Sequence, residues 1–158
     1  IRCDGQMLGF WDINAATAER MHDGWVLSGD IGKLDSNGYL YVLDRKDDMI
    51  ISGGFNIWPA ELENVLTDHP DVVEAAVFGV PSERWGESPY GVVTVTEGAM
   101  VTSDELIELC ADRLGSYKKP TQVEVTTDPL PKSPVGKLAR KQLREPHWVG
   151  HDRRVAGN

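Results

Sequence analysis

The sequence predicts an α+β fold in which helices pack on a small β-sheet, preceded by a β-hairpin segment. Hydrophobic residues make up 41% of the 158 residues, enough for the core of one ordinary domain. Short β-prone stretches alternate along the chain with segments whose apolar residues recur at helical spacing. Strands and helices therefore interleave, which favours helices packed on a shared sheet over separate α and β blocks.

The first part of the chain indicates short strands joined by polar turns. Residues 10–23 are typical of a loop or a short helix, and residues 25–27 of a strand. Asp35-Ser36-Asn37-Gly38 is a strong turn signal, and residues 39–43 form the expected strand after it. We therefore expect a hairpin that ends at residues 44–45.

The second part carries the alternating pattern. Pro59 suits the first turn of a helix that runs to about His69, and Thr102 with Glu105 forms a capping box that opens a second helix. A last helix is expected over 138–144. The expected strands are 49–51, 72–80, 90–96 and 123–125, with a turn at Ser52-Gly53-Gly54 and a loop at 81–86.

Four consecutive charged residues at 45–48 separate two apolar strands. Such a run is unlike a buried segment, so it predicts an exposed joint between two packing units. We expect residues 1–45 to be the end of one unit and residues 46–145 to form a second. Residues 146–158 are expected to be a tail of uncertain order.

Composition excludes several classes of function. The net charge of −9 argues against general nucleic-acid binding, although residues 117–158 carry nine Lys/Arg against four Asp/Glu. Two cysteines give no disulfide framework, four histidines give no metal-ligand pattern, and no apolar run is long enough for a membrane span. The first five residues lack the basic and apolar regions of a signal peptide, so we expect a cytoplasmic chain. The first residue is Ile and not Met, so we expect the chain to begin inside a longer reading frame or after processing.

Two motifs carry the functional prediction. Leu130-Pro131-Lys132-Ser133-Pro134-Val135-Gly136-Lys137 is a Pro- and Gly-bearing loop that ends in a lysine and precedes a basic helical stretch. The upstream run from Asp44 to Glu63 contains Met49-Ile50-Ile51-Ser52-Gly53-Gly54. Together they resemble the C-terminal signature motifs of the adenylate-forming superfamily, and of its acyl-CoA synthetases most closely. The resemblance covers roughly residues 5–145. It implies that residues 1–45 are the β-hairpin end of a large N-terminal domain and that residues 46–145 are the mobile C-terminal lid domain.

The resemblance implies roles in activating a carboxylic acid with ATP. Lys137 matches the catalytic lysine, whose ammonium stabilises charge between the carboxylate and the α-phosphate. Asp30, in Gly24-Trp25-Val26-Leu27-Ser28-Gly29-Asp30, matches the residue that binds the ribose hydroxyls, with Ser28 where Thr is usual. Arg45 matches an arginine that binds the ribose or phosphate. The alternative is that Arg45 has no ligand and forms a surface ion pair with Asp44 or Asp47.

Further positions match the second half-reaction, in which CoA attacks the acyl-adenylate. Asp47 matches the hinge about which the lid rotates between the two steps. Ser52, Gly53 and Gly54 match the segment along the pantetheine tunnel, since glycines let a chain run close to a thin ligand. Trp85, Tyr117 and Lys119 match CoA contacts in some relatives, where an aromatic plane beside cations suits a nucleotide. We expect the other cations, Lys132, Arg140, Lys141 and Arg144, to face solvent.

The superfamily's phosphate-binding Ser/Thr/Gly-rich loop is missing, as is its aromatic-Thr-Glu motif. Both belong to the large N-terminal domain, which also forms the acid pocket and through which Mg²⁺ would be held with ATP. We therefore expect this chain to be a fragment that depends on its own N-terminal domain and is inactive alone. Surface that normally meets that domain would favour homo-oligomers of the fragment.

The leading prediction is an acid–thiol ligase that converts a carboxylic acid, in our reading a fatty acid, to its CoA thioester. Two alternatives stay open. A carrier-protein-loading adenylation domain would share the hinge and the lysine, but the chain is expected to end after Arg154 without a linker to a carrier domain. A non-catalytic domain that binds a nucleotide or a protein partner would have no evident use for Lys137 and Asp30 together.

Overall fold

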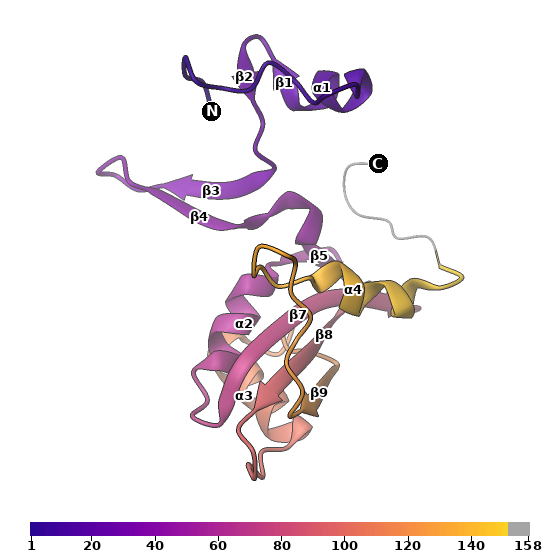
Figure 1. Cartoon of the computed structure of the whole chain (residues 1–158). Coiled ribbons are helices and arrows are strands. Elements are labelled where there is room, and N and C mark those ends of the chain that lie inside the picture. The colour runs from indigo at the N-terminus through magenta and orange to yellow at the C-terminus, as the bar shows by residue number, and fades with distance from the viewer. Residues whose placement is uncertain (152–158) are drawn as a thin grey trace. The chain divides into compact units, whose positions relative to one another are not determined.

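The computed structural model of the chain describes residues 1–151 and divides into two compact units, Ile1–Lys46 and Asp47–Asn158 (Figure 1). The sequence placed the joint one residue earlier, after residue 45. Residues 152–158 of the expected tail lie outside the described part of the chain. Among the described residues, no helix is long and apolar enough to cross a membrane.

The first unit contains one short helix and two small hairpins. Helix α1 (Asn14–Arg20) precedes strands β1 (Met21–His22) and β2 (Trp25–Val26), which pair antiparallel. Strand β3 (Asp30–Leu34) pairs antiparallel with β4 (Leu40–Arg45). The sequence did not indicate β3, because a glycine and two charged residues interrupt its alternation of apolar and polar side chains.

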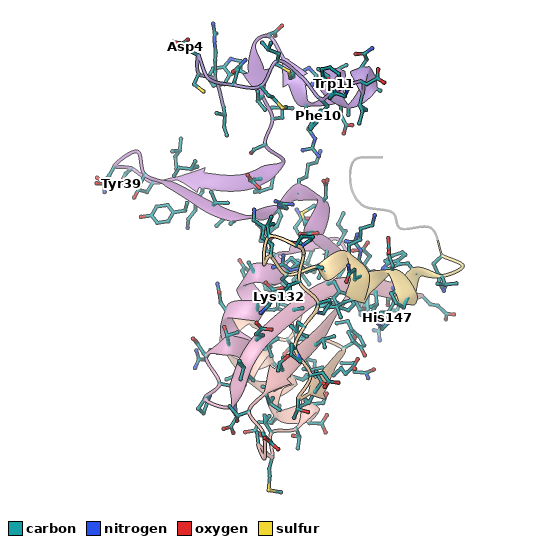
Figure 2. The ribbon with its side chains drawn as sticks, in the orientation of Figure 1. Asp4, Phe10, Trp11, Tyr39, Lys132 and His147 are labelled. Carbon is teal, nitrogen blue, oxygen red and sulfur yellow. The ribbon has the colours of Figure 1, made fainter. Side chains whose placement is uncertain are left out.

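The turn of the second hairpin is where the sequence predicts it. The Asp35 carboxylate accepts hydrogen bonds from the backbone N–H groups of Asn37 and Tyr39, each at 2.9 Å. The bond from Tyr39 contributes most to lowering the pKa of Asp35 below its ordinary value. Figure 2 shows Tyr39 at this turn, on a unit whose residues 1–46 include no buried side chain.

The second unit contains a five-stranded sheet built around β8 (Gly86–Val95). β8 pairs antiparallel with β7 (Val72–Ser82) and parallel with β9 (Gln122–Thr126). The start of β8, at Gly86, meets Ser52 of β5 (Ile50–Ser52), which pairs in turn with β6 (Phe55–Ile57). The expected loop at 81–86 is shorter than predicted, because β7 and β8 extend almost to a tight turn.

Two hydrophobic clusters cover the two faces of this sheet. Alternate residues of β7 separate between them, since side chains of a strand point to opposite faces: Val77 joins one cluster and Phe78 the other. Helices α2 (Pro59–Thr67) and α3 (Ser103–Leu114) complete the first cluster with Leu62, Leu66 and Leu106. The second cluster includes Leu130 and, at its edge, Leu138 and Leu143, from the segment containing α4 (Arg140–Arg144). Figure 1 shows α4 beside β7. Helices thus pack on a small sheet, as predicted.

Local signals account for the helix ends. The Thr102 hydroxyl accepts a hydrogen bond from the Glu105 N–H at 3.3 Å, and Pro59 occupies the first turn of α2. The last helix begins two residues later than expected. A 3₁₀ helix (Glu145–Trp148) follows it, and Trp148 Nε1 donates to the Gly79 carbonyl at 2.9 Å. This part of the expected tail is therefore attached to β7.

Cys110 on α3 belongs to the first cluster. Its side chain is fully buried, and this burial raises the pKa of the thiol to about 11. The thiol stays protonated at neutral pH and serves as a small apolar core residue.

Candidate functional site

A cavity of about 600 Å³ lies in the second unit, beside the turn that joins β5 to β6. The β5–β6 turn, the β7–β8 turn and the start of β8 form part of its wall, and α3 and the segment after it form the rest. The lining residues are Ser52, Gly53, Phe55, Trp85, Ser88, Pro89, Asp104, Ile107, Ser116, Tyr117, Lys119, Pro120 and Thr121. Small polar groups and aromatic rings both contribute to the lining, a composition suited to an organic ligand with polar ends.

Gly53 and Trp85 are in direct contact on one side of the cavity. Gly53 has φ +56°, and its N–H donates to the Trp85 carbonyl at 2.9 Å. A Cβ atom added at Gly53 would lie 2.8 Å from Trp85 Cε3. The indole thus packs on bare backbone, which only glycine provides. The Arg84 guanidinium lies over the same indole, 4.5 Å from the ring centroid, and further fixes its orientation.

Tyr117 and Phe55 form a second aromatic contact at the cavity, with ring centroids 5.0 Å apart. The two lysines after Tyr117 have different surroundings. Lys118 is mostly buried and forms an ion pair with Glu61 of α2, whereas Lys119 is exposed and lines the cavity. The ion pair anchors this segment to α2 and leaves Lys119 at the opening, where it can meet an anionic group.

Five of the six residues that the resemblance assigned to CoA line this one cavity: Ser52, Gly53, Trp85, Tyr117 and Lys119. Gly54, with φ +86°, belongs to the same turn but not to the lining. Phe55 and the α3 residues Asp104 and Ile107 also line the cavity and were not predicted from the sequence. For Phe55 the sequence holds a usable signal, since a large aromatic directly follows a glycine pair. The structure shows that its side chain is 55% exposed.

Lys137 lies elsewhere in the second unit, on a backbone turn outside this lining. The Ser133 N–H donates to the Lys137 carbonyl at 2.7 Å, and the Lys137 N–H donates to the Ser133 hydroxyl at 3.2 Å. Gly136, at φ +77°, donates to the Ser133 carbonyl. A bond from the Ala139 N–H to the Pro131 carbonyl closes the loop. The backbone is therefore well defined while the lysine is exposed.

The cations around Lys137 do not all face solvent, which corrects the sequence prediction. The side chains of Arg140 and Arg144 are only 24% and 17% exposed, and both form ion pairs with Asp48. Lys132 is half exposed and pairs with Glu74 of β7 (Figure 2). Lys141 alone of the four is as exposed as predicted. The acidic partners are distant in sequence, so spacing could not indicate them.

In the first unit, Asp30 and Arg45 are register partners across the β3–β4 hairpin. Arg45 Nε lies 3.9 Å from Asp30 Oδ1, and their side chains are 66% and 41% exposed. The alternative partner for the Arg45 side chain, Asp44, accepts instead from the Arg45 backbone N–H at 2.8 Å. A guanidinium and a carboxylate thus lie side by side on an exposed strand edge.

Asp47 lies in a 3₁₀ turn (Lys46–Asp48) and is the first residue of the second unit. Its side chain is exposed, whereas that of Asp48 is 23% exposed. The expected exposed run at 45–48 therefore ends one residue early. Within residues 1–151, no group of three or more His, Cys, Asp or Glu side chains could hold a metal ion.

The model of the AMP-binding enzyme C-terminal domain family matches residues 61–137. The chain belongs to this family of adenylate-forming enzymes. It is 47% identical over 86% of its length to a 2-succinylbenzoate–CoA ligase of Geobacillus kaustophilus. It is 39% identical over 95% of its length to a fatty acid–[acyl-carrier-protein] ligase of Streptomyces coeruleorubidus.

Solved structures of adenylate-forming enzymes agree with this family. ATP-bound MatB from Rhodopseudomonas palustris matches 92% of the chain with a TM-score of 0.83 and 34% identity. The chain spans 28% to 29% of the length of these three proteins. The segment that the family model matches contains Trp85, Tyr117, Lys119 and Lys137, whereas Asp30, Arg45, Asp47 and Ser52–Gly54 precede it.

Proposed function

We propose that this chain is the C-terminal part of an acid–thiol ligase that activates a carboxylic acid with ATP and transfers the acyl group to CoA. The observation that carries the proposal is the cavity at Gly53. Residues assigned to CoA from scattered sequence motifs, at positions 52, 53, 85, 117 and 119, meet there in one place. Residues that bind no common ligand would have no reason to line the same cavity.

In the first step, a carboxylate oxygen of the acid attacks the α-phosphorus of ATP. An acyl–phosphate bond forms, the bond to the leaving pyrophosphate breaks, and an acyl-adenylate results. Negative charge builds on the phosphate oxygens in the transition state, so a fixed cation there lowers the barrier. Lys137 would supply it, and its backbone turn gives the long side chain a defined starting point.

Asp30 and Arg45 would hold the nucleotide in this step. A carboxylate can accept two hydrogen bonds from the vicinal hydroxyls of ribose, and a guanidinium can donate to ribose or phosphate. Their adjacency on the β3–β4 hairpin would place both groups on one nucleotide. Mg²⁺ would accompany the ATP phosphates and would be held with them by the N-terminal part of the parent protein.

In the second step, the sulfur of CoA attacks the acyl carbonyl, a thioester bond forms, and AMP leaves. We propose that the second unit turns about Asp47 between the steps and brings the cavity to the adenylate. The bare backbone at Gly53 suits the thin pantetheine arm, the rings of Trp85 and Tyr117 suit its apolar and nucleotide parts, and Lys119 suits a phosphate.

For the acid we propose a fatty acid, which is the substrate class in the name of one relative but not of the other. The pocket that would select the acid belongs to the part of the parent protein beyond this chain. The isolated 158-residue chain is therefore expected to form no adenylate with any acid.

A second candidate acceptor is the phosphopantetheine of an acyl-carrier protein. The fatty acid–[acyl-carrier-protein] ligase of Streptomyces coeruleorubidus, which is similar over 95% of the chain, favours this candidate. The two acceptors share the pantetheine arm and thiol, and they differ in the nucleotide end that only free CoA carries. Lys119 at the opening of the cavity favours free CoA, because it would meet that phosphorylated end.

The test uses the intact parent polypeptide and its Lys137→Ala variant. Acid-dependent ATP–pyrophosphate exchange is measured over acetate, medium- and long-chain fatty acids, malonate and aryl acids, followed by thioester formation with free CoA and with a carrier protein. We expect exchange with fatty acids, loss of exchange in the variant, and thioester with free CoA. Equal exchange in both proteins would contradict the role of Lys137, and no exchange with any acid would contradict the ligase assignment.

A further inference from the structure

Four charged side chains form a cluster that joins the start of the second unit to α4. They are Asp48, Glu63, Arg140 and Arg144, and their exposed fractions are 23%, 12%, 24% and 17%. Two guanidinium groups face two carboxylates, so the charges compensate within the cluster. Removing charged groups from water costs free energy, and complete pairing of this kind is what allows it.

Glu63 and Arg140 are the best-defined pair of the cluster. Arg140 Nε donates to Glu63 Oε1 at 2.7 Å and Arg140 Nη2 donates to Glu63 Oε2, so the contact is bidentate. Glu63 Oε1 also accepts from the backbone N–H of Val77 at 2.9 Å. The carboxylate therefore ties α2 and β7 to the first residue of α4, in an orientation that a lysine could not reproduce.

Asp48 extends the cluster to the beginning of the unit. Its Oδ2 lies 3.8 Å from Arg140 Nη1 and its Oδ1 lies 3.8 Å from Arg144 Nη1. Asp48 directly follows Asp47, the proposed hinge residue. A single carboxylate thus contacts two successive turns of the segment that begins at Arg140.

Lys137 lies in the loop just before α4, three residues ahead of Arg140. The backbone turn at 133–137 and the bond from Ala139 to Pro131 define the loop itself, but they are local to it. Arg140 fixes the end of this loop to α2 and β7 through Glu63, whereas Lys132, near its start, pairs with Glu74 of β7. Displacement of Arg140 would therefore displace the lysine relative to the sheet.

We propose that Arg140 and Glu63 are positioning residues for Lys137, and that Asp48 joins them to the hinge so that the loop turns with the rest of the unit. This inference rests on the proposed function. Arg140 acts through Lys137 and has no need to touch the nucleotide. A misplacement of about 1 Å can cost roughly a hundredfold in rate, so loss of the bidentate contact should be measurable in the step that uses Lys137.

The test uses the parent protein with Arg140→Lys, which keeps the charge, and Glu63→Gln, which keeps the shape. Lys141→Gln is the matched control, because Lys141 is adjacent, 76% exposed and paired along the helix surface with Glu145. Two steps are measured separately: pyrophosphate exchange, which requires Lys137, and thioester formation from preformed acyl-adenylate, which bypasses it. Amide hydrogen exchange of residues 133–139 is recorded on the same proteins.

We expect Arg140→Lys and Glu63→Gln to lower exchange by about tenfold to a hundredfold and thioester formation by less than about threefold. In a Lys137→Ala background, neither should cause a further loss, because both act through the missing lysine. Amides at 133–139 should exchange faster in both variants and not in Lys141→Gln. If one variant fails to fold, the other carries the test.

Equal losses in the two steps, or a full further loss in the Lys137→Ala background, would show a merely structural role and overturn the proposal. Unchanged amide exchange at 133–139 would overturn it as well. Failure of the proposed function has a different signature, since wild-type protein would then show no acid-dependent exchange. Hydrogen exchange would still report in that case whether the cluster fixes the loop.

Discussion

The Lys137 loop and the Gly53 cavity belong to the same unit but are built in different ways. The loop presents one exposed charge and is held by backbone hydrogen bonds and, through Arg140, by ion pairs. The cavity is walled by aromatic rings packed on glycine backbone, with few charges. Placing a single charge against a phosphate requires orientation, whereas enclosing a thin, partly apolar chain requires shape. The difference is what two successive reactions with different ligands would demand of one small domain.

The largest effect is expected at Lys137. We expect Lys137→Ala in the parent protein to lower acid-dependent pyrophosphate exchange by about a hundredfold to a thousandfold, the usual cost of one well-placed transition-state donor. Lys132→Ala is the control, because Lys132 pairs with Glu74 on the surface of β7. It should change exchange by no more than about threefold. A large loss in both variants would mean that exchange depends on general positive charge in the loop.

At the cavity, the corresponding change is Gly53→Ala. The added Cβ would approach Trp85 Cε3 to 2.8 Å at a backbone φ of +56°, so the indole or the turn must move. We expect thioester formation from preformed adenylate to fall by about tenfold to a hundredfold. Gly98→Ala is the matched control, with φ +81° and no atom within 4 Å of the new Cβ. It carries backbone strain without a clash, and equal losses in the two variants would assign the effect to strain.

Trp85→Ala removes one wall of the cavity and leaves the backbone turn at Gly53 intact. The lost ring contact is expected to cost about 1 kcal/mol, which corresponds to a roughly fivefold rise in KM for CoA. Pyrophosphate exchange should not change. A rise in KM for ATP instead would place the indole near the nucleotide and contradict the assignment of this cavity.

The smallest effect is expected at Lys119. Its exposed ammonium would interact with a phosphate mainly through a screened charge, so Lys119→Gln should raise KM for CoA by about twofold at low salt. The effect should disappear at high ionic strength. The same measurement with an acyl-carrier protein as acceptor separates the two candidates. A salt-dependent effect with free CoA alone supports CoA as the ligand.

The elements that sequence predicted best are those whose signals are local. The turn at Asp35–Gly38 and the N-cap at Thr102 depend on nearby residues, and both are confirmed. Strands β3 and β6 were missed, because a short strand with glycine or polar residues has no clear period and is determined by its partner.

The candidate site divides in the same way. The residues assigned to CoA could be chosen from motifs, but only the fold shows that residues 52, 85 and 117 line one cavity. The ion pairs of Arg140 with Glu63 and Asp48 lay beyond sequence reasoning, since 77 residues separate Arg140 from Glu63 and no spacing rule relates them. The prediction that the cations of α4 face solvent was therefore wrong for Arg140 and Arg144 and right for Lys141.

The most direct test measures both half-reactions in one experiment, on wild-type parent protein, Lys137→Ala and Gly53→Ala. We predict that each variant loses a different step. Lys137→Ala should lose pyrophosphate exchange and retain thioester formation from preformed adenylate, whereas Gly53→Ala should retain exchange and lose thioester formation. If each variant lowers both steps by the same factor, the loop and the cavity do not serve separate reactions, and the central claim is contradicted.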